Sequence, residues 1–336
     1  MAHDLDFSTG KLAMAYVGKL PWHELGSQLK AGAPIETWIK AARLNWSLIS
    51  EPVLYRQGKK VQRMEDYFVL TRSDTGAALS IVSKGYLPVQ PKQVLEFYRD
   101  LTKDFGYSLE TAGALNGGRT IWALAKTGYQ AFVGGNNEDA IAGYLLLATS
   151  CDKSIATTAT FTSIRVVCQN TLHISLAQDG KTTRAVTVPH HKLFDPGAIK
   201  HQLGLADERW QEFIGSIRRL AEFKVDDALA EKFFEELLQP AGTKEARKPL
   251  SLAGAKEHQR LMSAYRTGTG QAIATAKGTA WGLVNAVSFH VDHIKPSASP
   301  SARLSNAWFG SGSRFKRKAW DQAIELAVIK PVLEKP

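Results

Sequence analysis

The chain has 336 residues, of which 44% are hydrophobic and 22% charged, an ordinary composition for a globular protein. No apolar run approaches the roughly 20 residues that a helix needs to cross a bilayer, and the acidic start lacks the regions of a signal peptide. These properties exclude a membrane protein and favour a cytoplasmic one. Lys and Arg outnumber Asp and Glu by 42 to 32, and the net charge of +10 favours a polyanionic partner, although evenly spread lysines give the same total.

The first third of the chain predicts an arm, one helix and an antiparallel meander. Residues 1–33 are irregular and rich in glycine, with Trp22 and His23 among turn-forming residues, which is typical of an ordered arm packed on a body. Pro34 begins a helix over 35–42, because the apolar residues there recur at helical spacing. The strands expected next are 45–49, 53–55, 67–72 and 78–82, with a turn at 73–76.

The middle of the chain predicts a second set of strands. A helix from Pro91 to about Lys103 precedes it, and Asn116–Gly118 is a strong hairpin signal. A further helix is expected from Gln169 to Ala177. The strands expected in this part are 107–112, 119–125, 140–148, 155–167 and 183–188.

The last part is mainly helical, over 197–240, over 250–294 with an interruption at Thr267–Gly270, and over 303–330. Strands and helices therefore segregate in runs, which favours an α+β fold. We expect antiparallel β-meander sheets with packed helices, followed by a mainly helical C-terminal region. The domains predicted are an α+β domain over 1–195 that includes the arm, and a helical region over 196–336 packed on it and ending in a basic helix.

Arg165-Val-Val-Cys168-Gln-Asn170 places polar residues inside an apolar run. Because burying Arg or Asn without partners costs several kcal/mol, the segment predicts either a structural polar network or part of a site. Cys168 and Cys151 form no CxxC pair, which argues against a zinc ribbon or redox dithiol, and we expect two core thiols. Asn170 predicts a helix start or a hydrogen-bond hub, and Arg165 remains open between a buried network and a phosphate contact.

Motifs for catalysis, metals and cofactors are absent from the sequence. There is no GxGxxG, GxxxxGK[ST], GxSxG or HExxH, and Asp66, Asp74, Asp139 and Asp152 are scattered singly near turns. The backbone of Gly268-Thr-Gly270 could meet a phosphate, but a plain turn between helices explains it better. We therefore predict no catalytic, metal or cofactor site. One question stays open: His290 and His293 share a helix face and could bind a metal, or be surface histidines near a helix end.

Two segments combine cations with aromatic rings, the mixture that grips single strands by charge and base stacking. The first is a hairpin tip around Tyr55, where a finger would touch a nucleic-acid backbone. The second is the run from Trp308 to Trp320, although its rings could instead be core residues of a helix whose basic side is solvated. The cations are Arg56, Lys59, Lys60 and Arg63 in the first segment, and Arg314, Lys316, Arg317 and Lys318 in the second.

Seven blocks of the sequence together carry a family resemblance. They are Asp4–Asp6, Pro21–Gly26, Ser83–Gln90, Thr111–Leu115, Arg165–Leu172, Gly278–His293 and Ala307–Gly310. With these blocks the chain resembles, nearly end to end, the phage/plasmid-like protein family of unknown function (domain of unknown function 932). The resemblance implies phage or plasmid genomes, a bacterial host cytoplasm and proximity to DNA metabolism. The order of strands and helices is also similar to Rad52-like phage single-strand annealing proteins, which combine a curved meander, helices and a basic groove, often in rings.

The first functional hypothesis is a non-enzymatic DNA-binding protein encoded by a phage or plasmid. It would bind or anneal single-stranded DNA in recombination or replication of the mobile element. Its partner is nucleic acid, with single-stranded DNA favoured, and a homo-oligomer is a further option; no membrane partner is expected. Stacking candidates are Tyr86, Trp281 and Trp308. Phosphate-neutralising candidates are Arg56, Lys59, Lys60, Arg63, Arg119, Arg165, Arg314, Lys316, Arg317 and Lys318.

Two alternatives belong to other classes. One is an enzyme acting on nucleic acid or a nucleotide, in which distant residues must converge on one cleft. The other is a partner-binding protein that counters host defence, with the positive charge incidental. The residues that the enzyme hypothesis brings together are Arg165, Cys168, Asn170, Asp292 and His293.

Overall fold

The computed structural model describes residues 5–18, 26–135, 137–165, 167, 170–173, 176–178, 181–183, 185–203, 206–239, 249–298 and 300–329. The fold is α+β, as the sequence predicts: antiparallel strands dominate the sheets, and the helices lie mostly in the second half of the chain. Within the predicted sequence blocks, Asp4, Pro21–Leu25, Val166, Cys168 and Gln169 lie outside the described residues.

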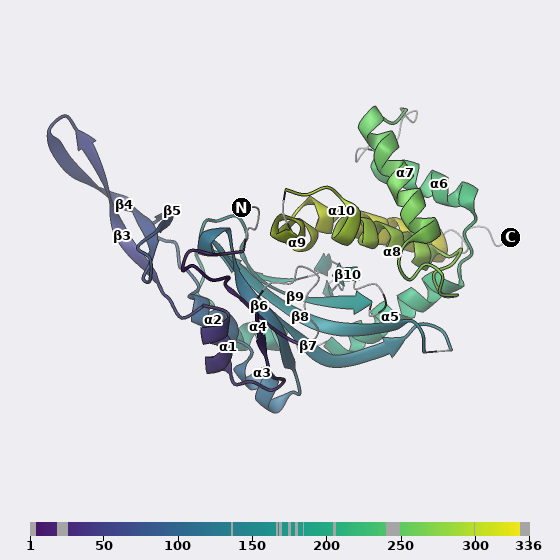
Figure 1. Ribbon diagram of the computed structural model, residues 1–336, viewed down its shortest axis with the longest axis horizontal. Helices are drawn as coiled ribbons and strands as arrows, with labels where there is room; N and C mark the ends of the chain where they lie inside the picture. Colours follow the sequence, from purple (N-terminus) through teal and green to yellow (C-terminus); the bar gives the residue numbers. More distant parts are fainter. Residues whose placement is uncertain are drawn as a thin grey trace.

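The central layer is a curved eight-stranded sheet in the order β10-β9-β8-β7-β6-β1-β2, with β13 also pairing β9 (Figure 1). All of its pairs are antiparallel except β1 with β2. Long runs of Ala, Leu, Ile and Trp in the middle strands bury both faces of the sheet. Its strands are β1 (Met14–Val17), β2 (Ser27–Leu29), β6 (Ser108–Leu115), β7 (Thr120–Phe132), β8 (Ala140–Ser150), β9 (Thr157–Arg165), β10 (Asn170–His173) and β13 (Val186–Val188).

A separate three-stranded sheet, β3-β4-β5, projects from one end of the molecule (Figure 1). It confirms the antiparallel meander expected in the first third of the chain. A two-stranded sheet, β11-β12, completes the strands of the described residues. The bounds are β3 (Leu48–Gln57), β4 (Lys60–Arg72), β5 (Ala78–Ser83), β11 (Leu176–Gln178) and β12 (Lys181–Thr183).

Helices cover the large sheet on both sides. Helix α2 contacts β7 and β8 on one side, and α8 and α10 contact β10 on the other (Figure 1). None of the helices described is both long and apolar enough to cross a membrane. The helices are α1 (Ile35–Ala41), α2 (Pro91–Glu96), α3 (Arg99–Asp104), η1 (Asn116–Gly118), α4 (Pro196–Leu203), α5 (Ala206–Glu222), α6 (Asp227–Leu238), α7 (Leu252–Thr267), α8 (Ala280–Phe289), η2 (His290–Ile294), α9 (Pro300–Trp308), α10 (Ser311–Ile324) and η3 (Glu325–Ile329).

Several local predictions are confirmed. Helix α1 buries Ile35, Trp38 and Ile39 on one face, and Asn116–Gly118 turns β6 into β7. The pause expected at Thr267–Gly270 is the end of α7, followed by a turn region that runs to α8. The sequence patterns located these elements because apolar spacing and turn residues agree with the tertiary contacts.

Two helix predictions are wrong. Asn170–His173 is a strand that pairs with β9, not the start of a helix, because its backbone completes the ladder opposite Thr162–Arg165. The helix expected from Pro91 to Lys103 is two helices, α2 and α3. The helix is interrupted at Phe97 and Tyr98, where the Tyr98 N–H donates to the Leu95 carbonyl, three residues back, at 3.0 Å.

Candidate nucleic-acid interface

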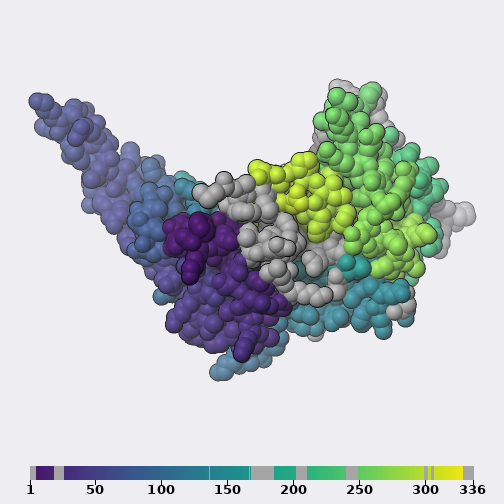
Figure 2. Space-filling view, viewed as in Figure 1, coloured from purple at the N-terminus to yellow at the C-terminus, as the bar shows by residue number. Residues whose placement is uncertain are grey.

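The hairpin of Val53–Met64, which we name the finger, is exposed at every residue from Leu54 to Met64. Beyond a bulge next to Pro52, each residue of β3 pairs with β4 in the register Val53↔Met64 to Gln57↔Lys60. The turn has two residues, and Gly58 occupies the first with φ of 61°, which suits a tight hairpin with native twist. In the space-filling view the finger stands clear of the rest of the molecule (Figure 2).

The finger carries the first predicted set of cations. Arg56, Lys59, Lys60 and Arg63 are all exposed, and the sequence from Leu54 to Met64 contains no Asp or Glu. The nearest carboxylate contact is Glu65, 3.9 Å from Arg63, with both side chains largely in water. A surface pair of this kind contributes little and leaves the guanidinium available. The tip is therefore a patch of four positive charges that projects into solvent.

Apolar side chains accompany these cations. Among the described residues, fourteen large apolar side chains are exposed, and seven of them lie in β3, β4 and β5. Such a concentration marks an interaction surface more often than chance exposure does. The seven are Ile49, Leu54, Tyr55, Val61, Met64, Tyr67 and Ile81.

Tyr55 is held in place by a chain of side-chain hydrogen bonds along the finger. Its hydroxyl donates to Gln62 at 2.8 Å, and the Gln62 amide donates to Gln57 at 3.0 Å. The ring remains 46% exposed. An ordered, exposed ring beside cations is a surface on which a base can stack. The sequence prediction of a basic, aromatic hairpin tip thus corresponds to a real hairpin, although whether it binds nucleic acid stays a prediction.

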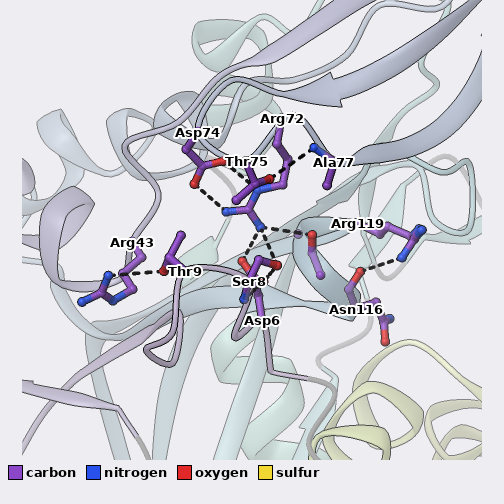
Figure 3. Close-up of polar contacts among 12 residues, drawn as sticks. Asp6, Ser8, Thr9, Arg43, Arg72, Asp74, Thr75, Ala77, Asn116 and Arg119 are labelled. Carbon is purple, nitrogen blue, oxygen red and sulfur yellow. Dashed lines mark hydrogen bonds and ion pairs between the residues drawn. The ribbon is translucent and has the colours of Figure 1, made fainter.

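The sheet from which the finger projects is fixed at its inner end, which we call the base, by a buried arginine that the sequence prediction missed. Arg72, at the end of β4, is fully buried and donates to Asp6, to the Gly117 carbonyl at 3.1 Å and to both oxygens of Asp74 (Figure 3). Its guanidinium also lies over the Trp46 ring, 4.2 Å from the centroid. These contacts join the finger to the N-terminal segment and to the β6–β7 turn. We name them the base network.

The protonation states in the base network follow from its contacts. The hydrogen bond from Arg72 lowers the pKa of Asp74 below its ordinary value, in spite of burial. Burial alone would lower the pKa of Arg72, but its bonds to Asp74 and Asp6 outweigh that effect and raise the pKa. Both groups are therefore charged at neutral pH, and the pair persists over the physiological range.

Two hydrogen bonds fix β5 to the body of the protein, and a third fixes the segment just after it. The Ser80 hydroxyl donates to the Cys151 carbonyl at 2.5 Å, and Arg119 donates through Nε to the Leu79 carbonyl at 2.9 Å. Just after β5, Tyr86 donates to the Ser150 carbonyl at 2.8 Å and stacks on His190. Arg119 and Tyr86 are half-buried and donate hydrogen bonds within the protein. Their first role is therefore to anchor the sheet that carries the finger.

The open question about Arg165 is answered by its burial. Its side chain forms a double hydrogen bond with Asp139, 2.5 Å from Nε to Oδ1 and 2.8 Å from Nη2 to Oδ2, and both residues are buried. Thr275 and Trp281 also donate to Asp139, at 2.5 and 3.2 Å. Arg165 is thus part of a structural network, not a phosphate contact, because no phosphate reaches a guanidinium in this position.

The same arginine explains the glycine at position 270. Gly270 has φ of 82°, its carbonyl accepts from Arg165 at 3.2 Å, and a Cβ there would lie 2.9 Å from the guanidinium. Only glycine allows both the backbone conformation and this close approach. The segment Gly268–Gly270 is therefore a turn that receives Arg165, which agrees with the reading of it as a turn between helices.

The cations of α10 divide into two pairs. Arg314 and Arg317 are exposed and three residues apart, so they share one helix face. Lys316 is buried and its amine is 2.7 Å from Asp292, which corrects the prediction of a phosphate contact there. Lys318 is half-buried and caps the end of α6 by donating to the carbonyls of Leu237 and Gln239; burial lowers its pKa.

Two of the aromatic candidates are packed into the protein. Trp281 is 1% exposed in the first turn of α8, so it cannot stack on a base, and the prediction for it is wrong. Trp308 is half-buried and meets Trp122 edge to face, with ring centroids 5.3 Å apart. Of the predicted nucleic-acid contacts, Arg165, Lys316 and Trp281 are therefore buried, and the Lys318 amine is bonded to the end of α6.

Two of the residues that the enzyme hypothesis brings together form ion pairs within the protein. Asp292 forms an ion pair with Lys316, Arg165 forms one with Asp139, and Cys168 lies outside the described residues. His290 is buried against Glu257 at 2.9 Å, and that hydrogen bond lowers the pKa of Glu257 to about 2. Burial raises the pKa of the Cys151 thiol to about 12, so it is not a nucleophile. Within the described ranges, no three His, Cys, Asp or Glu side chains gather as a metal site would need.

A family match covers residues 78–319, which is 242 of the 336 residues, and its description is a domain of unknown function (DUF932). The chain belongs to the DUF932 family. No curated protein and no solved structure matches the chain. The likeness to Rad52-like annealing proteins accordingly stays a hypothesis.

The DUF932 match begins at the first residue of β5. The strand that anchors the finger lies inside the matched range, whereas the finger itself precedes it. The base network likewise joins residues on both sides of this limit, since Arg72 precedes it and Gly117 follows it. The family name carries no reaction, so the function must be argued from the geometry of the chain.

Proposed function

We propose that the protein binds nucleic acid through the finger, and that its ligand is single-stranded DNA handled during recombination or replication of a phage or plasmid genome in a bacterial cytoplasm. The observation that supports the proposal is the projecting tip with four exposed cations and no carboxylate from Leu54 to Met64. A phosphate backbone is the ligand with a dense row of negative charges, and such a tip can approach it without desolvating an ion pair.

The apolar companions of the cations favour unpaired bases over duplex DNA. Binding to a duplex by phosphate contacts needs charge alone, whereas single strands also expose base faces that stack on rings and apolar groups. The ordered Tyr55 ring, with its hydroxyl fixed by Gln62, offers such a surface. Annealing of two strands, as in Rad52-like proteins, belongs to the proposal as its most specific form. The proposal requires no catalytic residue.

The test is a binding titration over a range of salt. Protein purified after nuclease treatment is mixed with labelled oligothymidine and with a duplex of equal length, and native mass is recorded in parallel. A single strand releases about 0.7 counterions per neutralised phosphate, so four contacts contribute about 3 to the slope of log affinity against log salt. The variant R56Q/K59Q/K60Q/R63Q should therefore bind single strands with a slope about 3 shallower than the wild type.

The matched control removes four exposed lysines elsewhere, K30Q/K40Q/K92Q/K103Q, and reaches the same net charge of +6, since 10 − 4 = 6. It should keep most of the wild-type slope. Equal losses in the two variants would mean that net charge alone drives binding, and the assignment to the finger would be wrong. Absence of salt-dependent binding in the wild type would refute the proposed function itself.

A further inference from the structure

The finger is apolar and cationic on both of its faces. Residues directly opposite in an antiparallel pair project to the same face. Leu54 pairs with Arg63 and Arg56 with Val61, and these four form the first face. The second face consists of the pairs Val53–Met64, Tyr55–Gln62 and Gln57–Lys60.

Each face contains what a single strand needs. The first face exposes Leu54 by 61% and Val61 by 60%, beside two guanidinium groups. The second exposes Tyr55 by 46% and Met64 by 43%, beside the amine of Lys60. A hairpin that binds on one side only would present one apolar face and one polar face. Here both faces combine apolar area for bases with positive charge for phosphates.

Charge decides which partner these faces suit. Exposed apolar strands can pair with a second copy of the same chain, and β3 is an edge strand. Two fingers lying together would, however, bring four cations against four cations with no carboxylate between Leu54 and Met64 to compensate. A polyanion with apolar surfaces meets no such repulsion. Unpaired nucleic-acid strands have both properties.

We propose that the finger inserts between the two strands of a splayed duplex end, so that each face holds one unpaired arm. The inference rests on the proposed function and specifies its substrate as forked DNA. Five residue pairs at about 3.4 Å per residue make a finger of about 17 Å, and five nucleotides reach along this length even at the rise of about 3.4 Å of a stacked strand. Arms of about five nucleotides should therefore suffice for full affinity.

Fluorescence anisotropy compares three labelled probes: a duplex with two arms of six thymidines, a single strand of twelve thymidines, and the blunt duplex. The wild type should bind the fork about tenfold more tightly than the single strand. Shortening both arms to two nucleotides should abolish this preference. A base analogue whose fluorescence rises on unstacking, placed at the junction, should report insertion directly.

Two variants separate the faces while keeping every cation. L54S/V61S alters the first face, and Y55S/M64S alters the second. Each should lower fork affinity about tenfold, because one arm loses its apolar contacts, and each should leave single-strand affinity within about threefold, because the other face remains. The control L193S/L252S removes two exposed apolar side chains outside the three-stranded sheet and should change neither affinity.

The outcomes distinguish the inference from the proposed function. Tight binding to single strands without preference for the fork would overturn the inference and leave the proposed function intact. Failure to bind any probe would overturn both. A change in native mass in L54S/V61S or Y55S/M64S, with fork affinity unchanged, would identify a second copy of the chain as the occupant and would also overturn the inference.

Discussion

The base network makes a quantitative prediction about the finger. Replacing Arg72 by Met keeps a long side chain but removes the charge and all five donors. Asp6 and Asp74 then lose their shared cation, and the Gly117 carbonyl loses a donor. Asp6 is almost fully buried, so its carboxylate cannot recover the lost interaction from water.

The expected cost can be worked from these contacts. Breaking a buried ion pair costs about 3–5 kcal/mol, and the lower value applies because Asp6 keeps two donors from Ser8 and Asp74 is partly exposed. Unfolding entropy of about 2.1 cal/mol/K per residue gives about 0.7 kcal/mol/K for 336 residues. A loss of about 3 kcal/mol therefore lowers Tm by about 4 °C if the finger unfolds with the whole chain.

If the base network opens locally while the rest of the chain stays folded, hydrogen exchange detects the opening. Amide protons of β5 and of the paired part of β3 should then exchange about 100-fold faster in R72M, while those of β8 keep their protection. The control is R43M, which removes only a bond of 3.3 Å to Thr9 beside the network (Figure 3). If R72M changes neither Tm nor exchange by more than R43M does, the network does not fix the finger and the reasoning is refuted.

Three further predictions concern charges elsewhere. The pKa of Glu257 is lowered from 4.5 to about 2. Its contribution of about 3 kcal/mol to the free energy of unfolding is therefore complete above pH 4.5 and is lost as pH falls towards 2. The variant E257Q should weaken this loss of stability at acid pH, as measured by urea titrations. R165K keeps the charge but loses one of two charge-assisted bonds, so it should cost about 2 kcal/mol and leave DNA affinity within twofold. R314Q/R317Q should make the single-strand salt slope about 1.4 shallower if these exposed residues extend the interface.

Each of these predictions has an outcome that contradicts it. A parallel loss of stability in E257Q and wild type below pH 4.5 would mean that Glu257 is not held ionised by the fold. Stable R165K protein with strongly weakened DNA binding would return Arg165 to the interface. An unchanged slope in R314Q/R317Q, with the finger variant still impaired, would restrict the interface to the finger.

Local patterns predicted the elements of this fold where local and tertiary preferences agree. The hairpin at Asn116–Gly118 and the helix after Pro34 are examples, since their turn residues and apolar spacing match their final contacts. The segment after Asn170 was predicted wrongly because its pairing partner, β9, is supplied by the sheet and not by its own residues. The break at Phe97 and Tyr98 was missed because no proline or glycine marks it in the sequence between Lys92 and Asp104.

The same limit applies to the candidate interface. The finger cations were predicted because Arg56 to Arg63 surround a turn with no carboxylate nearby in sequence. The burial of Arg165 depends on Asp139, 26 residues away, and on Trp281, which donates to Asp139 across 142 residues. Arg72 was missed for the same reason, since Asp6 is 66 residues distant. Asp6 did lie in a block of the family resemblance, which was the one signal available for the base network.

Substitutions in the finger can change binding without changing the stability of the fold. Every residue from Leu54 to Met64 is exposed, so substitutions there remove no buried contact. The stabilising contacts are instead at the base, where Arg72, Ser80 and Arg119 fix β4 and β5 to the body. A hairpin held this way is already ordered before it binds. Binding therefore avoids part of the entropic cost of association. A loss of DNA binding in a tip variant with unchanged Tm therefore reports on contacts with the ligand and not on the fold.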